Sequence, residues 1–379
     1  MSLLNYFDSM MNVYKYHVYA WIQPRQLWLI TFAFSVVLII LISFIFIHLT
    51  RSAAKRLKKQ SLQHQYIDFI SNLAICESEE EIESLCDDSS MKLDIQRWLS
   101  TSYSRYILSQ ELVAAVKNMN GVAAKNICFF FEKAGLEKDA LHRLQKGEWD
   151  VKAKAIQMLA QLNQKKHIAR IYRLANDKNE LVRNEARIAV VKLTGFAGLR
   201  FLDVISYPLT EWQQLYLLHE LTQQTDLSEE DIHRWLKSEN NSVVAFALRL
   251  VETYKVYDLH DDVVDCLAHT EKDIRSKAIR ALQEINRADT AQILVNHFEK
   301  EDEEIQLNIL QSLSHTGTEE QINFLSKALM HYRDDFKITA ARAIKTIKSD
   351  GLKVIEQAIN ISSAPWSILY PQLQREESL

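Results

Sequence analysis

The chain has 379 residues and a formal net charge of −4 at pH 7, with 47% hydrophobic and 25% charged residues. Seven glycines and four prolines are too few for the tight turns of a sheet protein, so the composition excludes an all-β fold and favours helices. The chain contains no glycine-rich phosphate loop, no His-Glu-x-x-His helix and no paired zinc-type cysteines, which argues against the common nucleotide and metal enzymes.

Residues 1–26 precede the most apolar part of the chain and carry apolar residues at helical spacing. These residues are Leu3, Leu4, Phe7, Met11, Tyr14, Val18 and Trp21. The spacing suits a helix that lies in the membrane interface, and an aromatic belt beside a membrane span explains the same residues equally well. We expect this segment to be extracytoplasmic or interfacial.

Residues 27–49 (LWLITFAFSVVLIILISFIFIHL) contain no Asp, Glu, Lys or Arg. A helix of this length reaches about 35 Å, which is enough to cross the hydrocarbon core of a bilayer. A cleaved signal peptide would have a basic start, a shorter apolar region and a small-residue cleavage site. A core helix of a globular domain would have a polar face. The run therefore predicts a retained transmembrane helix.

Five basic residues follow this run before the next acidic residue, and we call them the basic collar: Arg51, Lys55, Arg56, Lys58 and Lys59. By the positive-inside rule the collar places the C-terminal part in the cytoplasm and the N-terminus outside, in a single-pass protein of the inner (plasma) membrane. Each collar residue is also a contact for anionic headgroups, worth about 1 kcal/mol. After residue 60 the chain has 38 basic and 48 acidic residues and no basic stripe, so we expect no nucleic-acid partner.

Residues 50–89 hold the collar and a predicted helical neck. The apolar residues of the neck recur at helical spacing: Leu57, Leu62, Tyr66, Phe69, Ile70 and Leu73. Ser78 with Glu81 three residues later predicts the capped start of a short helix.

A repeat of 31 residues follows. Its anchor positions advance in steps of 31, with one step of 30: Val151, Val182, Gln213, Val243, Ile274, Ile305 and Phe336. Four residues after the anchors stand Ala155, Ala186, Leu217, Ala247, Ala278, Ile309 and Ala340, and eight residues after them Leu159, Val190, Leu221, Val251, Leu282, Leu313 and Ile344. This ladder is one face of a helix, and its recurrence means that each helix buries that face only against its neighbours. It predicts a solenoid.

A second apolar stripe follows the first helix in the better repeats, as at Ile168, Ile171 and Leu174, so each repeat is expected to be a pair of antiparallel helices. Acidic residues just before the anchors suit the positive end of a helix: Asp150, Asp273, Glu304 and Asp335. Basic residues just after the anchors are expected to reach the acid of the adjoining repeat: Lys152, Arg183, Arg275 and Lys337.

The stretch Asp273–Leu282, with the pattern Asp-Ile-Arg-x-x-Ala-x-x-Ala-Leu, resembles the HEAT family, particularly its short class named after phycobilin lyases. The resemblance covers residues 120–358 and implies an all-α fold, a right-handed α-solenoid of HEAT-like helix pairs behind one N-terminal transmembrane helix. We expect the solenoid over residues 90–360, with degenerate first repeats, and a C-terminal tail over residues 361–379. Such folds bind proteins and indicate little about chemistry.

The repeat anchored at Gln213 departs from the pattern, because Trp212 and Gln214 replace the acid and the base. The stretch from residue 207 to residue 242 is also longer than in other repeats and contains Pro208. We expect a bend or altered curvature there.

One cluster has residue types that bind metals: His260, Asp261, Asp262, Asp265, Cys266 and His269. Cys266 and His269 lie one helical turn apart, but a zinc site needs a third and a fourth ligand in fixed geometry. We favour a solvated acidic helix edge with Cys266 facing the core. An enzyme of unknown reaction that uses His260, Cys266 and His269 is the alternative.

Other enzymatic signals are weak. Deoxyhypusine hydroxylases share HEAT-like repeats and use several His-Glu pairs as iron ligands, whereas this chain has only His219-Glu220. The remaining cysteines, Cys76, Cys86 and Cys128, form no Cys-x-x-Cys pair and are expected to be free thiols in a reducing compartment. We expect no enzymatic activity, no cofactor, no metal and no small-molecule ligand.

The sequence therefore predicts a membrane-anchored cytosolic scaffold or adaptor that binds another protein, itself membrane-associated, through its solenoid, with residues 27–49 in contact with lipid. The chain looks like bacterial inner-membrane HEAT proteins, which implies an accessory subunit of an envelope complex such as a polysaccharide synthase or a secretion system. A membrane-tethered lipid or nucleic-acid sensor that uses the basic collar is a further alternative.

Overall fold

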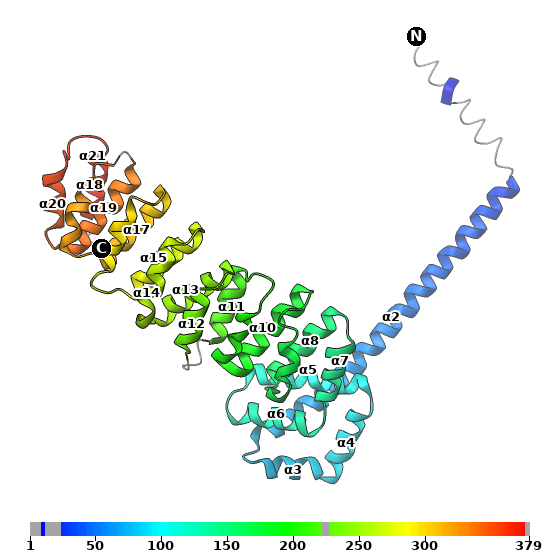
Figure 1. Ribbon diagram of the computed structural model, residues 1–379. Helices are drawn as coiled ribbons and strands as arrows, with labels where there is room; N and C mark the ends of the chain where they lie inside the picture. Colours follow the sequence, from blue (N-terminus) through cyan, green and yellow to red (C-terminus); the bar gives the residue numbers. More distant parts are fainter. Residues whose placement is uncertain (1–8, 12–23, 222–226, 332, 376–379) are drawn as a thin grey trace. The chain divides into compact units, whose positions relative to one another are not determined.

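The computed structural model describes residues 9–11, 24–221, 227–331 and 333–375, apart from the side chains of residues 24–27 and of Lys55 (Figure 1). The secondary structure of these residues is helical, with no strand among them, so the predicted all-α fold is confirmed. The chain divides into two compact units, residues 1–136 and residues 137–379. Of the apolar residues predicted to matter in the segment 1–26, all but Met11 lie outside the described residues.

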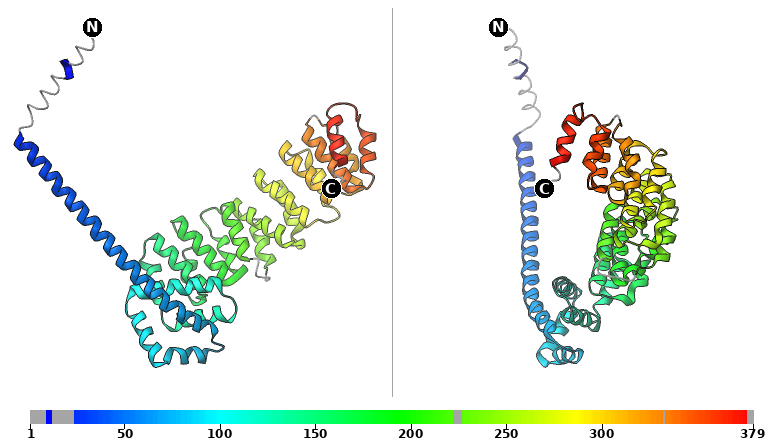
Figure 2. Two further views of the ribbon diagram at one scale, coloured as in Figure 1. Left: turned by 180° about the vertical axis from the view of Figure 1, so that it is seen from behind. Right: turned by 90° about the vertical axis from the view of Figure 1, so that its left-hand side faces the viewer.

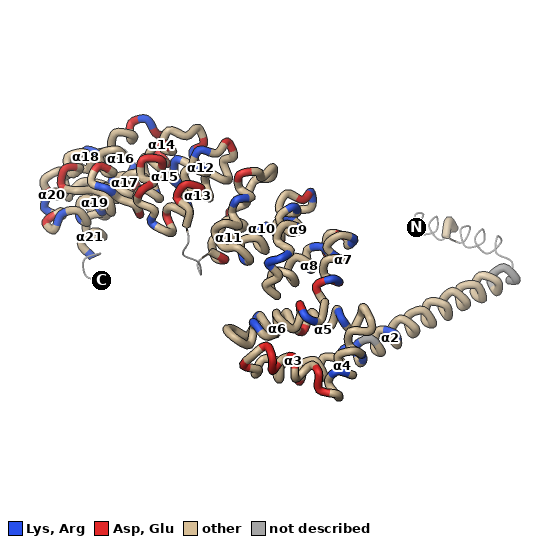
Figure 3. The backbone as a smooth tube through the Cα atoms, turned by 60° about the horizontal axis from the view of Figure 1, so that its bottom comes forward, with Lys and Arg blue, Asp and Glu red and all other residues tan. Residues whose placement is uncertain are grey.

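The N-terminal unit contains the helices α2 (Pro24–Ile75), α3 (Glu79–Asp87), α4 (Ser89–Ser100), α5 (Ser102–Asn118) and α6 (Val122–Lys133). Helix α2 runs for 52 residues without a break, so the apolar run and the neck form one helix of about 78 Å (Figures 1 and 2). Among the described residues it is the one helix long and apolar enough to cross a membrane, by length and composition alone. Figure 3 shows its apolar part free of charged positions up to the collar.

The C-terminal end of α2 lies in an aromatic core. Tyr66 and Phe69 meet Trp98 of α4 edge-on, with ring centroids 5.1 and 5.5 Å apart. Phe69 also meets Phe130 of α6 at 4.9 Å. Edge-to-face pairs of this kind add about 0.5–1.5 kcal/mol each to the free energy gained by burial. By contrast, Leu57, at the start of the predicted neck stripe, is exposed.

Polar groups close the turn between α2 and α3. Asn126 of α6 is buried, and its Nδ2 donates to the carbonyls of Leu73 (3.1 Å) and Cys76 (2.7 Å), which satisfies acceptors at the end of α2. At the start of α3 the Ser78 hydroxyl accepts the Glu81 N–H at 3.3 Å. The capped helix predicted from Ser78 and Glu81 is confirmed.

The C-terminal unit begins with α7 (Glu137–Lys146). Seven first helices then follow: α8 (Trp149–Gln161), α10 (Glu180–Thr194), α11 (Glu211–Leu221), α13 (Asn241–Tyr254), α15 (Lys272–Glu284), α17 (Glu303–Thr316) and α19 (Asp334–Ile347). Every predicted anchor is the third residue of its helix. Of the 21 ladder residues 19 are buried, and Val151 and Gln213 are half-buried. The first helices are stacked side by side (Figure 2), and the ladder is their buried face, as predicted.

A second, shorter element follows each first helix. These elements are α9 (Ile168–Tyr172) after η1 (Lys165–His167), η2 (Gly195–Asp203), α12 (Glu229–Leu236), α14 (His260–Asp265) between η3 (Tyr257–Leu259) and η4 (Cys266–Ala268), α16 (Thr290–Phe298), α18 (Ile322–Ala328) after η5 (Glu319–Gln321), and α20 (Gly351–Ala358). Helix α21 (Trp366–Arg375) lies within the predicted tail. The predicted domain boundaries and the predicted bend stay predictions.

One second element differs from the expected α-helix. Residues 195–203 form the 3₁₀ helix η2, which packs directly on α10. A Cβ at Gly198 would lie 2.8 Å from the Val190 carbonyl oxygen, so only glycine permits this close approach.

Leu313 lies on the ladder in α17 and is fully buried. We expect Leu313→Ala to lower the free energy of unfolding by about 2–5 kcal/mol, because the stacked neighbours cannot collapse fully around the cavity. Leu93→Ala is the matched control, since Leu93 of α4 is 64% exposed, and it should cost less than about 0.5 kcal/mol. Thermal unfolding of the full chain in detergent, followed by circular dichroism, measures both. Equal melting temperatures for the two variants would contradict the assigned ladder.

Candidate functional site

An arginine after the anchor ties α15 both to the loop before it and to the next repeat. Arg275 donates from Nη1 to the carbonyls of His269 (3.0 Å) and Thr270 (3.1 Å). Its Nε donates to the carboxylate of Glu301, in the loop before α17, at 2.9 Å. One planar guanidinium thus links the loops of two successive repeats.

Arg183 of α10 repeats this arrangement. Its Nη1 donates to the carbonyls of Asp177 (2.8 Å) and Lys178 (3.2 Å), six and five residues before it, as in Arg275. Its guanidinium lies over the ring of Tyr207, in the loop before α11, 4.0 Å from the ring centroid. The contact with the next loop is made to an aromatic ring rather than to the predicted carboxylate.

The expected contact with the next repeat is wrong for Lys337. Its Nζ pairs with Asp334, in the first turn of its own helix α19, at 2.9 Å. The ammonium group of lysine has no planar fork of donors, so a single lysine does not reproduce the link that an arginine makes to two loops.

In α11 the residue after the anchor is Gln214, which is shorter than arginine. Its Nε2 donates to the carbonyls of Leu209 and Ser242, both at 3.4 Å. The side chain is 3% exposed, and its Oε1 accepts no hydrogen bond from any residue that the structure describes. Buried amide oxygens are normally hydrogen-bonded, so the unpaired Oε1 of Gln214 is an exception.

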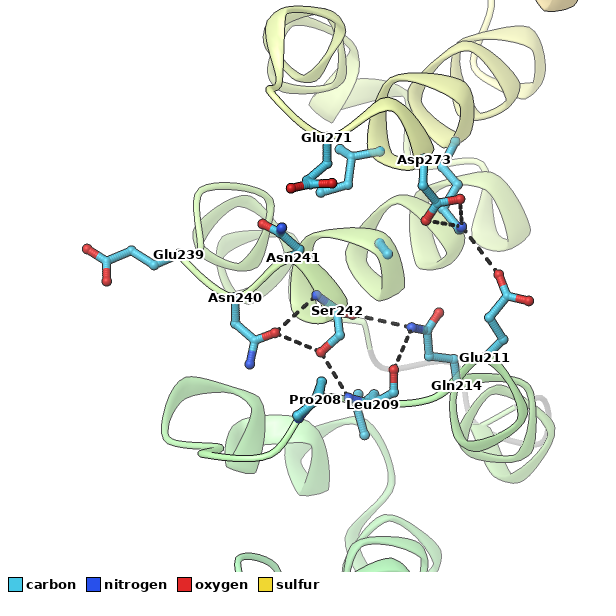
Figure 4. Close-up of a pocket in the computed structure, with 13 residues that line it drawn as sticks. Pro208, Leu209, Glu211, Gln214, Glu239, Asn240, Asn241, Ser242, Glu271 and Asp273 are labelled. Carbon is cyan, nitrogen blue, oxygen red and sulfur yellow. Dashed lines mark hydrogen bonds and ion pairs between the residues drawn. The ribbon is translucent and has the colours of Figure 1, made fainter. Parts of the chain in front are cut away.

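A groove of about 510 Å³ lies beside Gln214, between the first turns of α11, α13 and α15 (Figure 4). The groove contains four carboxylates, those of Glu211, Glu239, Glu271 and Asp273, against the single cation of Lys277. We call it the acidic groove.

The charges in the acidic groove are only partly compensated. Lys277 is 9% exposed, and its Nζ contacts Asp273 and, at 3.4 Å, Glu211. Glu239 and Glu271 are exposed and have no ion pair with any described residue. Two carboxylates are therefore available to a cation from outside.

The floor of the acidic groove is fixed by hydrogen bonds between repeats (Figure 4). The Asn240 Oδ1 accepts the Ser242 N–H at 3.0 Å, which caps α13, and the Ser242 hydroxyl at 2.7 Å. The same hydroxyl oxygen accepts the Leu209 N–H at 2.9 Å. The loop before α11 is thereby held against the start of α13.

Gln213, the anchor of α11, helps to cap its own helix. The Gln213 Oε1 accepts the Thr210 N–H at 3.1 Å, and the Thr210 hydroxyl accepts the Gln213 N–H at 3.3 Å. This is a capping box, and the Thr-x-x-Gln pattern that signals it is present in the sequence.

Helix α11 also exposes an apolar face next to the acidic groove. Trp212 is 74% exposed, and Leu215 and Tyr216 lie exposed on the same helix. Leu181, at the position of Trp212 one repeat earlier, is exposed on the neighbouring helix α10. Exposed apolar residues grouped on one helix face are typical of protein-binding surfaces.

The candidate metal cluster is not assembled. His260 is fully buried and its Nε2 lies 2.8 Å from the Thr290 hydroxyl, whereas the His269 Nδ1 accepts the Glu271 N–H at 3.0 Å. Cys266 faces the core, as predicted, and burial raises the pKa of its thiol to about 11, with the nearby Asp265 adding to the shift. Among the described residues no group of three or more His, Cys, Asp or Glu is placed to hold a metal ion.

The basic collar lies on α2 as expected from its position in the sequence. Arg51, Arg56, Lys58 and Lys59 are exposed, and the Lys58 ammonium is 6.0 Å from the centroid of the Tyr103 ring. The role of the collar at a membrane stays a prediction.

Comparison with known proteins agrees with the repeat geometry. The family model described as HEAT repeats matches residues 260–345. The predicted resemblance to that family is thus confirmed, and the matched part contains α15, α17 and the anchors Ile274, Ile305 and Phe336. No curated protein matches the chain.

Several solved structures are similar to the chain at low sequence identity. One is an engineered protein, at 16% identity and a TM-score of 0.38 over 84% of this chain and 95% of that one. Another is Kap95p bound to RanGDP, at 13% identity and 0.38, over 82% of this chain and 46% of Kap95p. A third is the CpcE–CpcF phycocyanin lyase complex of Nostoc sp. PCC7120, at 12% identity and 0.26, over 75% and 96%.

Thiol reactivity separates a core cysteine at position 266 from an activated one. At pH 8 a thiol with a pKa of about 11 is almost entirely protonated, and Cys266 is buried, so it should be alkylated far more slowly than the partly exposed Cys76. Mass spectrometry after treatment with iodoacetamide measures the order of modification, and urea-unfolded protein, in which both cysteines react alike, is the control. A Cys266 that reacts first would restore the enzymatic alternative.

Proposed function

We propose that the chain is a single-pass membrane protein whose HEAT-like solenoid lies in the cytosol and holds another protein at the membrane. The exposed face of α11 is the observation that carries this proposal. It occurs in the repeat that departs from the family pattern, and nothing in the packing of the solenoid requires a tryptophan that is 74% exposed.

The length and composition of α2 support the membrane anchor. Its 18-residue window of highest hydropathy has a mean hydropathy of 3.0, and none of that window is buried within the protein. Such a surface is stable in lipid and would aggregate in water.

The collar supports the orientation. Basic residues follow the apolar run directly, and Arg51 and Arg56 on α2 are exposed, as contact with anionic headgroups requires. On this topology residues 50–379 are cytosolic and the N-terminus is outside.

The apolar face of α11 supports protein binding rather than catalysis. Aromatic residues that are exposed in the free protein and bordered by polar groups are enriched among the residues that dominate interface energies. The groove beside this face supplies polar acceptors and carboxylates around it. We infer that the chain acts as an accessory subunit of an envelope complex, with a polysaccharide synthase or a secretion system as the class of partner.

The topology has a direct test. The full chain should stay in the membrane fraction after an alkaline wash, and added protease should remove residues 61–379 from inside-out vesicles but leave them intact in right-side-out vesicles. Neutralising the collar by R51Q, K55Q, R56Q, K58Q and K59Q should give a mixed orientation, because the charge difference across the span is lost. A chain released by the wash would contradict the anchor.

The α11 face is tested by substituting its tryptophan. Trp212→Ala should weaken retention of the partner by roughly thirtyfold or more, as expected for an interface hot spot worth about 2 kcal/mol. Trp149→Ala is the matched control, since Trp149 at the start of α8 is 49% exposed and lies outside this face. Chemical crosslinking in cells, followed by purification of the tagged full chain, measures retention. Equal behaviour of the two variants would contradict the assigned surface.

A further inference from the structure

The acidic groove occupies the place that an arginine of the chain fills in another repeat. Arg275 is the fourth residue of α15, and the carbonyls that it contacts stand three and two residues before that helix. Its carboxylate partner, Glu301, stands two residues before the next first helix. The geometry of this repeat therefore defines three acceptor positions around one guanidinium.

The same acceptor positions surround the acidic groove. Gln214 is the fourth residue of α11, Pro208 and Leu209 stand three and two residues before that helix, and Glu239 stands two residues before α13. All four line the groove. The acceptors are present, and the guanidinium is replaced by a shorter amide.

We propose that the acidic groove receives an arginine side chain of the partner, presented by a cytosolic segment of another membrane protein, in the position that Arg275 fills within its own repeat. This inference rests on the proposed function and names the chemistry of the partner at that site. The incoming guanidinium donates to the Gln214 Oε1 and to the carboxylate of Glu239, and the carbonyls of Pro208 and Leu209 lie beside it.

The buried amide of Gln214 indicates a ligand independently of the charges. Its oxygen is unpaired among the described residues, and in Figure 4 it points away from the Leu209 carbonyl and toward the groove. No described residue donates to this oxygen, so a ligand with an N–H group would pair it. Figure 4 also shows the Glu239 side chain turned outward, as expected for a carboxylate without a partner. Rotation about its side-chain bonds turns the carboxylate toward the groove.

The charge balance selects a cation. The single charge of Lys277 offsets only one of its two contacts, Asp273 and Glu211, and Glu239 and Glu271 have no ion pair with any described residue, so a ligand meets a net negative groove. Arginine fits better than lysine because its planar fork of five donors reaches a carboxylate and two or more carbonyl-type oxygens at once, as Arg275 does.

The membrane setting identifies the kind of segment. Cytosolic loops and juxtamembrane segments of membrane proteins are enriched in Lys and Arg. A segment that follows a membrane helix also carries apolar residues, and the exposed face of α11, beginning at Trp212 beside the groove residue Glu211, gives those residues a surface.

The test uses the full chain in detergent and three fluorescent peptides that differ at one position. The peptides carry an arginine, a lysine or the neutral isostere citrulline between two leucines, in a Gly-Ser frame. Anisotropy at physiological salt should show the arginine peptide binding roughly tenfold or more tightly than the citrulline peptide, the difference expected for one charge-assisted hydrogen-bonded pair, with lysine between them.

Gln214→Arg is the decisive variant. Its own guanidinium fills the groove and pairs with Glu239, so the variant should melt at a higher temperature than the natural chain and lose binding of the arginine peptide. Gln306→Arg, the same substitution at the same position of α17, is the matched control and should leave the affinity unchanged. Glu239→Gln should weaken the arginine peptide selectively, whereas Glu230→Gln, an exposed carboxylate of α12 outside the groove, should not.

Several outcomes overturn the proposal. Equal affinity for arginine and citrulline peptides, undiminished binding by a folded Gln214→Arg chain, or an equal effect of Glu239→Gln and Glu230→Gln would each exclude an arginine site. If the full chain retains a protein through Trp212 and the Gln214→Arg chain retains it equally, the adaptor function stands and the arginine site falls. If no protein is retained while the chain still distinguishes the arginine peptide from the citrulline peptide, the arginine site stands and the adaptor function falls.

Discussion

The burial of one apolar stripe per first helix is the interaction on which the C-terminal unit depends. The ladder residues of a repeat are buried against the neighbouring repeats, so a single repeat would leave them exposed and would have little burial to offset the backbone entropy lost on folding. One repeat alone is therefore unstable. Stacking supplies the burial, since α10 lies against α8, and α17 against both α15 and α19. The same stacking brings equivalent residues of successive repeats to the same edge, so the position of a residue within its repeat determines which loops it can contact.

This register shows what the glutamine at position 214 changes. At the position after the anchor, Arg183 and Arg275 each join two loops. Their guanidinium groups donate hydrogen bonds to the backbone carbonyls of the loop before the helix. The Nε2 of Gln214 lies 3.4 Å from the Leu209 carbonyl oxygen, and its Oε1 has no hydrogen-bond donor among the described residues. The packing of the ladder is untouched, because Leu217 and Leu221 of the same helix are buried. The fold thus tolerates a shorter polar side chain at its edge, whereas a cavity among the ladder residues would lower the free energy of unfolding by several kcal/mol.

The helices and their buried faces follow from the sequence because both depend on local spacing. The anchors, the pairing of helices and the cap at Ser78 were all predictable in this way. The capping box of Thr210 and Gln213 is equally local, but the ladder accounts for Gln213 only as an anchor position. The acidic groove was not predictable to the same degree. Trp212 and Gln214 stood out as departures, yet the link between Gln214 and Glu239 depends on which loop of the next repeat lies opposite, and spacing within one helix carries no information about that.

The continuity of α2 couples its apolar part to the rest of the N-terminal unit. No glycine, and no proline after Pro24, occurs in this helix, and sharp kinks in helices arise mainly at such residues. Its last turns place Tyr66 and Phe69 in the core against Trp98, so a rotation of α2 about its axis would expose both rings and cost several kcal/mol of burial. A flexible tether raises only the local concentration of what it carries. A helix that is at once membrane-compatible and part of the core fixes orientation as well, because the core admits only one face of it.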